Sequence, residues 1–81
     1  MPSEEFDGRN IEVIDFGDVS SGGRVIEFRD PQIRRNDSIL AISVPDEGSW
    51  RDASISIDPT VGDVPVSFAL WAIAVAQTRI G

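Results

Sequence analysis

The chain has 81 residues, a length suited to one domain with a small core. Its 14 acidic residues outnumber 7 basic residues, all arginine, and give a net charge of −7. This balance argues against binding to nucleic acid, which needs clustered lysine and arginine. The absence of cysteine excludes disulfides, thiolate zinc sites and thiol nucleophiles. Because so short a domain buries only about 60% of its unfolded surface, we expect self-association or a partner to stabilise it.

The residue types on which most enzymes depend are also missing. The chain lacks histidine, cysteine, lysine and tyrosine, so a base or nucleophile could come only from carboxylates and hydroxyls. The neighbouring carboxylate pairs are Asp15 with Asp18, Asp46 with Glu47, and Asp58 with Asp63. Each pair falls in a turn or at a strand end, where solvated acids are ordinary, and the chain has little room for a pocket. We therefore expect no enzyme activity, no cofactor and no metal site.

The first residues predict a tail. Residues 1–9, MPSEEFDGR, are mostly polar and contain turn formers, so we interpret them as a flexible acidic tail before a single domain over residues 10–81. They lack the basic start and apolar stretch of a secretory signal. The longest apolar run, residues 64–76, is shorter than the about 20 residues that span a bilayer. These features predict a cytoplasmic protein with no membrane contact.

Four segments have the composition of β-strands. They cover residues 11–16, 24–29, 38–44 and 53–58. The first does not alternate cleanly, because Val13 and Ile14 are adjacent, which indicates a bulge or a strand covered on both faces. The last alternates best, with Ala53, Ile55 and Ile57 on the inward face and serines on the outward face. Short connections rich in turn formers predict a four-stranded antiparallel meander of two hairpins.

The end of the chain changes to a helical period. Asp63 can serve the free amides at a helix start, Pro65 suits a first turn, and Gly81 suits a C-terminal cap. These signals predict a helix from residue 64 or 65 to residue 80. Packed on one face of the sheet, it gives the chain an α+β fold.

The large side chains of this helix separate into two opposed stripes at about 100° per residue. One stripe contains Val66, Leu70, Ile73 and Ile80, and the other contains Val64, Phe68, Trp71 and Val75. A helix on a single sheet needs only one apolar stripe. Three explanations stay open: a curved sheet covers both stripes, the second stripe meets another copy in a homodimer, or it docks a different protein.

Further interface candidates lie outside the helix. Arg34 and Arg35, with Arg29, form the main basic cluster, which could bind a phosphate or carboxylate of a partner, although such runs are commonly solvated. Trp50 has the parity of the outward serines in residues 53–58, so it either caps the sheet edge or anchors an interface. The candidate interface residues are Trp50, Phe68, Trp71, Val75, Arg34 and Arg35.

Two functional hypotheses fit these observations. The first is a non-catalytic protein-protein interaction module, an inhibitor of the immunity or antitoxin kind, whose acidic surface complements a basic protein. The second is a homo-oligomeric structural or accessory subunit with its C-terminal helix in a symmetric interface. Both predict a heterocomplex or homo-oligomer in which neither nucleic acid nor a membrane is the partner.

Overall fold

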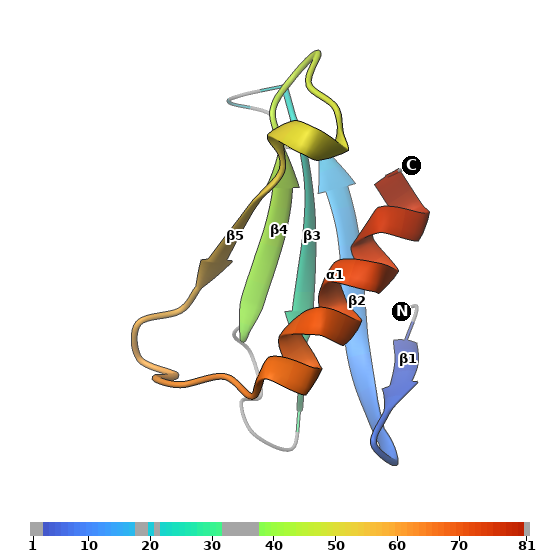
Figure 1. Cartoon of the computed structure of the whole chain (residues 1–81), viewed down its shortest axis with the longest axis vertical. Coiled ribbons are helices and arrows are strands. Elements are labelled where there is room, and N and C mark those ends of the chain that lie inside the picture. The colour runs from blue at the N-terminus through green and yellow to red at the C-terminus, as the bar shows by residue number, and fades with distance from the viewer. Residues whose placement is uncertain (1–2, 18–19, 21, 32–37, 81) are drawn as a thin grey trace.

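The computed structural model describes residues 3–17, 20, 22–31 and 38–80. Five strands in this part of the chain form one antiparallel sheet in chain order, and the helix α1 lies across one of its faces (Figure 1). The elements are β1 (Ser3–Phe6), β2 (Arg9–Gly17), β3 (Arg24–Arg29), β4 (Leu40–Val44), the short 3-10 helix η1 (Trp50–Asp52), β5 (Ser54–Ile57) and α1 (Val66–Ile80). The predicted α+β class and antiparallel meander are confirmed.

The first strand lies in the segment that we interpreted as a flexible tail, so the prediction of four strands is wrong. β1 pairs antiparallel with residues 9–12 of β2. Asp7 and Gly8 connect the two strands with φ angles of 53° and 77°. Positive φ at both central residues is typical of a type I′ hairpin turn, which matches the twist of the strands. The sequence Asp-Gly favours this turn.

The other four strands lie within two residues of their predicted ends. β2 and β3 pair in continuous register from Glu12 opposite Arg29 onward, so the bulge that we considered does not form there. Val13 is fully buried in the core beneath α1, whereas Ile14 points to the opposite face and is half-buried. The two adjacent apolar residues therefore serve the two faces of one strand.

The core lies between α1 and one face of the sheet. Its fully or almost fully buried strand residues are Ile11, Val13, Ile26, Phe28, Leu40 and Ile42. The opposite face, which we call the open face, carries Ile14, Phe16 and Val25 among polar side chains, and Phe16 is 40% exposed. The molecule therefore has two layers, and α1 covers one face of the sheet (Figure 1).

α1 meets the sheet through its smallest side chains. Ala72 and Ala76 are fully buried, and Phe68 beside them is 3% exposed. The alanines lie between the two apolar stripes on the helical wheel. We call Ala72 and Ala76 the alanine row. This row faces the sheet, and each apolar stripe contacts the core along one side of it.

The stripe that contains Phe68 packs toward the β1 side of the sheet. The ring of Phe6 lies 5.3 Å from that of Phe68 and 5.1 Å from that of Trp71, and Trp71 also contacts Phe28 at 5.8 Å. These tilted and edge-to-face arrangements are favourable for aromatic rings. The strand missing from the sequence-based fold thus supplies an aromatic partner for the helix.

The start of α1 differs slightly from its prediction. The amide of Ala69 donates to the carbonyl of Pro65 at 3.1 Å, which places Pro65 just before the first helical residue, Val66. Asp63 is exposed and lies further upstream. The predicted cap Gly81 lies outside the described residues.

Candidate functional site

Large hydrophobic side chains are exposed mainly on one side of the molecule. Among the described residues, the exposed ones are Phe16, Ile55, Ile57, Val66 and Leu70. Phe16 lies on the open face, whereas the other four belong to β5 and to α1. We call Ile55, Ile57, Val66 and Leu70 the apolar patch.

The β5 half of the patch results from the placement of α1. Ile55 pairs with Ile42 and Ile57 pairs with Leu40, so all four side chains share the face that the helix covers. Ile42 and Leu40 are buried, but Ile55 is 43% exposed. In Figure 1 the helix runs away from β5 toward β2, and this divergence leaves the last strand of the core face uncovered.

The α1 half of the patch lies on the stripe that faces β5. Ile73 lines the same groove as Ile55, and Leu70 and Val66 lie about one and two turns before Ile73 on that side of the helix. Leu70 is 62% exposed and Val66 is 72% exposed. The exposed part of this stripe therefore borders the exposed face of β5.

A groove of about 190 Å³ lies between β5 and α1 and includes Ile55 of the apolar patch in its lining, and we call it the β5 groove. It is lined by Ile42, Trp50, Ala53, Ser54, Ile55 and Ile73. Trp50 reaches this side because η1 interrupts the extended chain before β5. The turn of η1 is fixed by the amide of Ser49, which donates to Asp52 Oδ2 at 2.9 Å.

Acidic residues stand at both ends of β5. Asp46, Glu47 and Asp52 are exposed at the end where β5 begins, with Arg51 next to Asp52 in the sequence and Arg24 in the lining of the same surface hollows. Asp58 follows the last residue of β5. Between these ends β5 has the sequence SISI and bears no charge.

Asp58 also shapes the chain beyond β5. Its Oδ1 accepts hydrogen bonds from the Thr60 amide at 2.9 Å and from the Thr60 hydroxyl at 2.8 Å. A carboxylate that binds the backbone two residues on is a common way to end a strand in a turn. The connection to α1 then passes Asp63, which is exposed.

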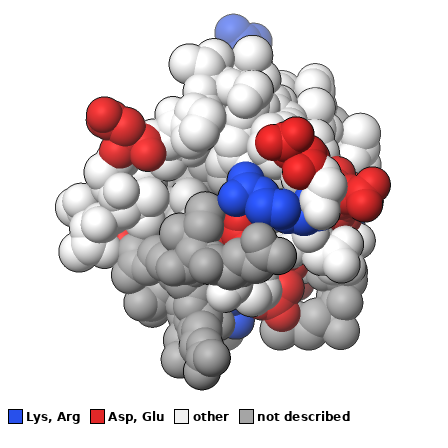
Figure 2. Space-filling view, turned by 90° about the horizontal axis from the view of Figure 1, so that it is seen from below, with Lys and Arg blue, Asp and Glu red and all other residues white. Residues whose placement is uncertain are grey.

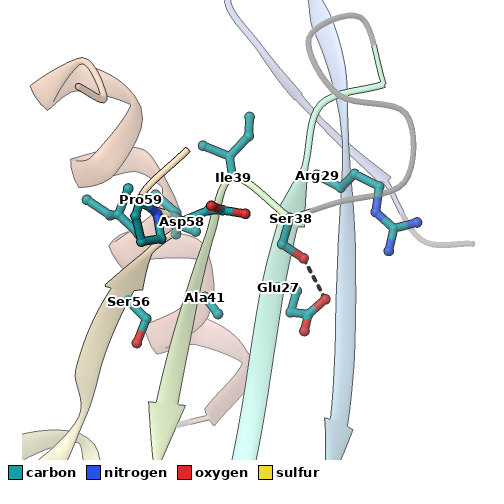
Figure 3. Close-up of a pocket in the computed structure, with 10 residues that line it drawn as sticks. Glu27, Arg29, Ser38, Ile39, Ala41, Ser56, Asp58 and Pro59 are labelled. Atoms are coloured by element: carbon teal, nitrogen blue, oxygen red, sulfur yellow. Dashed lines mark hydrogen bonds between the residues drawn. The ribbon is translucent and has the colours of Figure 1, made fainter. Parts of the chain in front are cut away.

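A larger hollow of about 460 Å³ lies on the other side of β5 (Figure 3). Glu27 and Asp58 are the carboxylates in its lining. Glu27 Oε1 accepts a hydrogen bond from Ser38 Oγ at 2.6 Å, and Asp58 is bound to Thr60. The guanidinium of Arg29 points away toward β2, where Glu12 lies 3.9 Å from it. These carboxylates have local structural roles.

Most described arginines are close to acids. Arg9 contacts Asp30 at 3.1 Å, and Arg24 contacts Asp15 at 2.6 Å. Figure 2 views one end of the molecule, where the basic side chains near the centre of the view have acidic groups beside them. Neutralisation of arginines by neighbouring acids leaves the remaining surface dominated by negative charge.

The predicted interface residues differ in where they lie and in how far they are buried. Trp50 is half-buried beside the β5 groove and not on the open face, because η1 breaks the parity on which that prediction rested. Phe68 is buried, and Trp71 and Val75 are half-buried against the protein's own core. Arg34 and Arg35 lie outside the described residues.

The apolar patch itself was only partly visible in the sequence. Val66 and Leu70 belong to a predicted stripe, but their exposure depends on how the helix is rotated. Ile55 and Ile57 were predicted to point inward, and they do share the core face. Their exposure follows from the angle between α1 and β5, for which the sequence has no signal.

Comparison with models of known protein families, with curated proteins and with solved structures found no match. In the described part of the chain, no three metal-ligating side chains come together as they would around an ion. Within the residues that the structure describes, no helix is long and apolar enough to cross a membrane.

Proposed function

We propose that this protein is a non-catalytic protein-binding module that takes a basic protein as its partner. The observation that supports this proposal is the apolar patch beside the β5 groove, with acidic residues at both ends. An apolar centre with a polar, charged surround is the usual anatomy of a protein interface. An exposed patch of large side chains on a small protein commonly marks such a surface.

The charge of the protein favours a basic partner. A net charge of −7 on 81 residues attracts a basic surface from a distance and accelerates association at low ionic strength. Aromatic and large aliphatic side chains then supply the binding energy at the centre of the contact. An inhibitor of the immunity or antitoxin kind, which must capture a basic protein quickly, would use these two properties together.

A homo-oligomeric accessory subunit is the second candidate, and the exposed stripe of α1 is the observation that favours it. Val66 and Leu70 could pack against the same stripe of another copy in a two-fold interface. The net charge weighs against this arrangement, because two copies would each bring −7 to the contact.

Photo-cross-linking can test the proposal. A photo-reactive phenylalanine analogue is placed at Leu70 in the full chain, and a matched one at Phe16 on the open face, in cells that naturally express the protein. We expect position 70 to capture one defined protein with a high isoelectric point, and position 16 not to capture it. With that protein purified, the association rate should fall steeply with added salt.

Two serine variants then identify the surface. Leu70→Ser should weaken binding by about tenfold or more, because it removes an exposed apolar side chain from the patch. Phe16→Ser removes an exposed apolar side chain from the open face and should leave binding unchanged. Cross-linking only to a second copy would favour the accessory subunit, and equal effects of the two variants would contradict the proposed surface.

A further inference from the structure

β5 forms one edge of the described sheet. It pairs with β4 on one side, and β4 is its only strand neighbour within the described residues. The edge strand of a sheet presents backbone N–H and C=O groups that another extended chain can bind. A partner that docks at the apolar patch therefore also meets a row of hydrogen-bonding groups.

The direction of these groups follows from one hydrogen bond. The amide of Asp58 donates to the carbonyl of Ile39 at 3.2 Å, so the chain directs this amide toward the β4 side. Amide direction alternates along an extended antiparallel strand. The backbone groups of Ser56 and Ser54 therefore face β4, and those of Ile57 and Ile55 face away from the sheet.

The other edge strand of the described sheet, β1, carries charge, whereas β5 does not. β1 has the sequence SEEF, and its two glutamates place charge on that edge. Charged side chains on an edge strand discourage further strands from pairing with it. β5 has the sequence SISI with no charged side chain, so this common protection is missing from the edge beside the apolar patch.

The β5 groove fits a strand better than a helix. An α-helix is about 10 Å across, which is large for a groove of about 190 Å³. A strand added beside β5 would lie about 4.8 Å from it and project alternate side chains to the groove side, about 7 Å apart. Such side chains would cover Ile55 and Ile57 and extend toward Leu70.

The charges at the ends of β5 select among possible strands. Asp52 and Asp58 lie six positions apart and bracket the uncharged stretch between them. A second copy of β5, paired antiparallel with Ile55 opposite Ile55, would bring Asp52 of each chain close to Asp58 of the other, which is unfavourable. A strand with lysine or arginine at both ends would instead complement both acids.

We propose that β5 binds an extended segment of a basic protein by strand addition. The segment has alternating apolar residues that enter the β5 groove and basic residues about six positions apart. Its backbone pairs with the outward groups of Ile55 and Ile57. This inference rests on the proposed protein-binding function and specifies how the partner is held.

A display library of random dodecapeptides, selected against the full-length protein, supplies the probe. We expect enriched peptides to alternate β-branched or aromatic residues with polar ones and to carry lysine or arginine at both ends. On binding of an enriched peptide, the exchange of the Ile55 and Ile57 amides with solvent should slow by about tenfold or more. The amides of Ser54 and Ser56, already directed to β4, should change little.

Two variants at one position separate backbone from side chain. Ile55→Ala and Ile55→Pro both remove the isoleucine, but only proline removes the outward N–H, which an edge strand can lose without breaking its own ladder. We expect Ile55→Pro to bind an enriched peptide about tenfold more weakly than Ile55→Ala. The exchange experiment uses the unaltered protein. If the Ile55 and Ile57 amides exchange with solvent equally fast with and without an enriched peptide, strand addition is contradicted.

The outcomes also distinguish this inference from the proposed function. Enriched peptides with helical apolar spacing that depend on Leu70 but bind both Ile55 variants equally would contradict strand addition and leave the protein-binding function standing. Enriched peptides that bind independently of Leu70, Ile55 and added salt would contradict both.

Discussion

The side chain of Arg24 donates a hydrogen bond to the carbonyl oxygen of Arg79 at 3.3 Å and so joins β3 to the last turn of α1. The same guanidinium donates to Asp15 Oδ2 on β2 at 2.6 Å. Carbonyl groups at a helix C-terminus lack partners within the helix and form the negative end of its dipole. Arg24 therefore holds the end of α1 against two strands at once.

Replacement of Arg24 should release the end of the helix. Arg24→Met keeps most of the apolar stem and removes the charge, and we expect a loss of about 0.5–1 kcal/mol in the free energy of unfolding, because the ion pair is partly exposed. Amides in the last turn of α1 should exchange faster in hydrogen-exchange experiments. Arg51→Met removes an exposed arginine from η1 and is the matched control. Equal exchange in the two variants would show that Arg24 does not hold the helix end.

The one buried charged residue among those described is Asp30, whose side chain is 1% exposed and 3.1 Å from Arg9. Arg9→Met would leave the carboxylate buried without this cation, and we expect a loss of about 2–3 kcal/mol. Adding Asp30→Asn should recover part of that loss, because a neutral amide is less costly to bury. Urea denaturation of both single variants and the double variant measures the coupling. If the losses of the two single variants simply add in the double variant, Arg9 and Asp30 do not stabilise each other.

The alanine row of α1 offers a test of how the helix is seated. Ala72 is fully buried at the sheet, so Ala72→Leu should push the helix outward and cost about 1–3 kcal/mol. Ala74 is exposed two residues later, and Ala74→Leu should change stability by less than about 0.5 kcal/mol. Thermal unfolding of the pair compares the two faces of the helix. The opposite order would require a different rotation of α1.

The sequence carried enough signals for the helix and the last four strands, because β-strand composition, turn residues and helical periodicity agreed there, although the strand that became β2 does not alternate cleanly. The first strand also had a signal: Asp7-Gly8 between Phe6 and Arg9 is a strong hairpin sequence. Its polar surroundings concealed it, since Ser3, Glu4 and Glu5 suggested a tail. β1 adds one aromatic side chain to the core, so hydrophobic patterning alone does not reveal it.

The candidate site was harder to predict, because it depends on relations between elements. Which residues of the two helical stripes are exposed depends on the contact between the alanine row and the sheet. The exposure of Ile55 depends on the direction in which α1 crosses the strands. Trp50 was assigned to the wrong face, because three residues of 3-10 helix shift the parity between Trp50 and β5. Local patterns contain none of this information.

Close backbone packing beside the hairpin of β2 and β3 predicts that a side chain at Gly23 destabilises the protein. A Cβ atom at Gly23 would collide with the carbonyl oxygen of Val44 on the neighbouring strand. We expect Gly23→Ala to cost about 1–3 kcal/mol. A Cβ atom at Gly17, near the same hairpin, would meet a single neighbouring atom at 3.9 Å, so Gly17→Ala should be tolerated. If chemical denaturation shows the same stability for Gly23→Ala and Gly17→Ala, this close packing at Gly23 is contradicted.

Phe6 tests whether β1 is part of the folded core. Its ring contacts those of Phe68 and Trp71 on α1, so Phe6→Ala should cost about 2–4 kcal/mol through lost burial and lost aromatic contacts. Glu5→Ala, in the same strand, changes an exposed side chain and serves as the control. Tryptophan fluorescence should also shift in Phe6→Ala, because Trp71 gains contact with water. If both variants unfold at the same urea concentration as the unaltered protein, β1 contributes nothing to stability and behaves as the tail that its composition suggested.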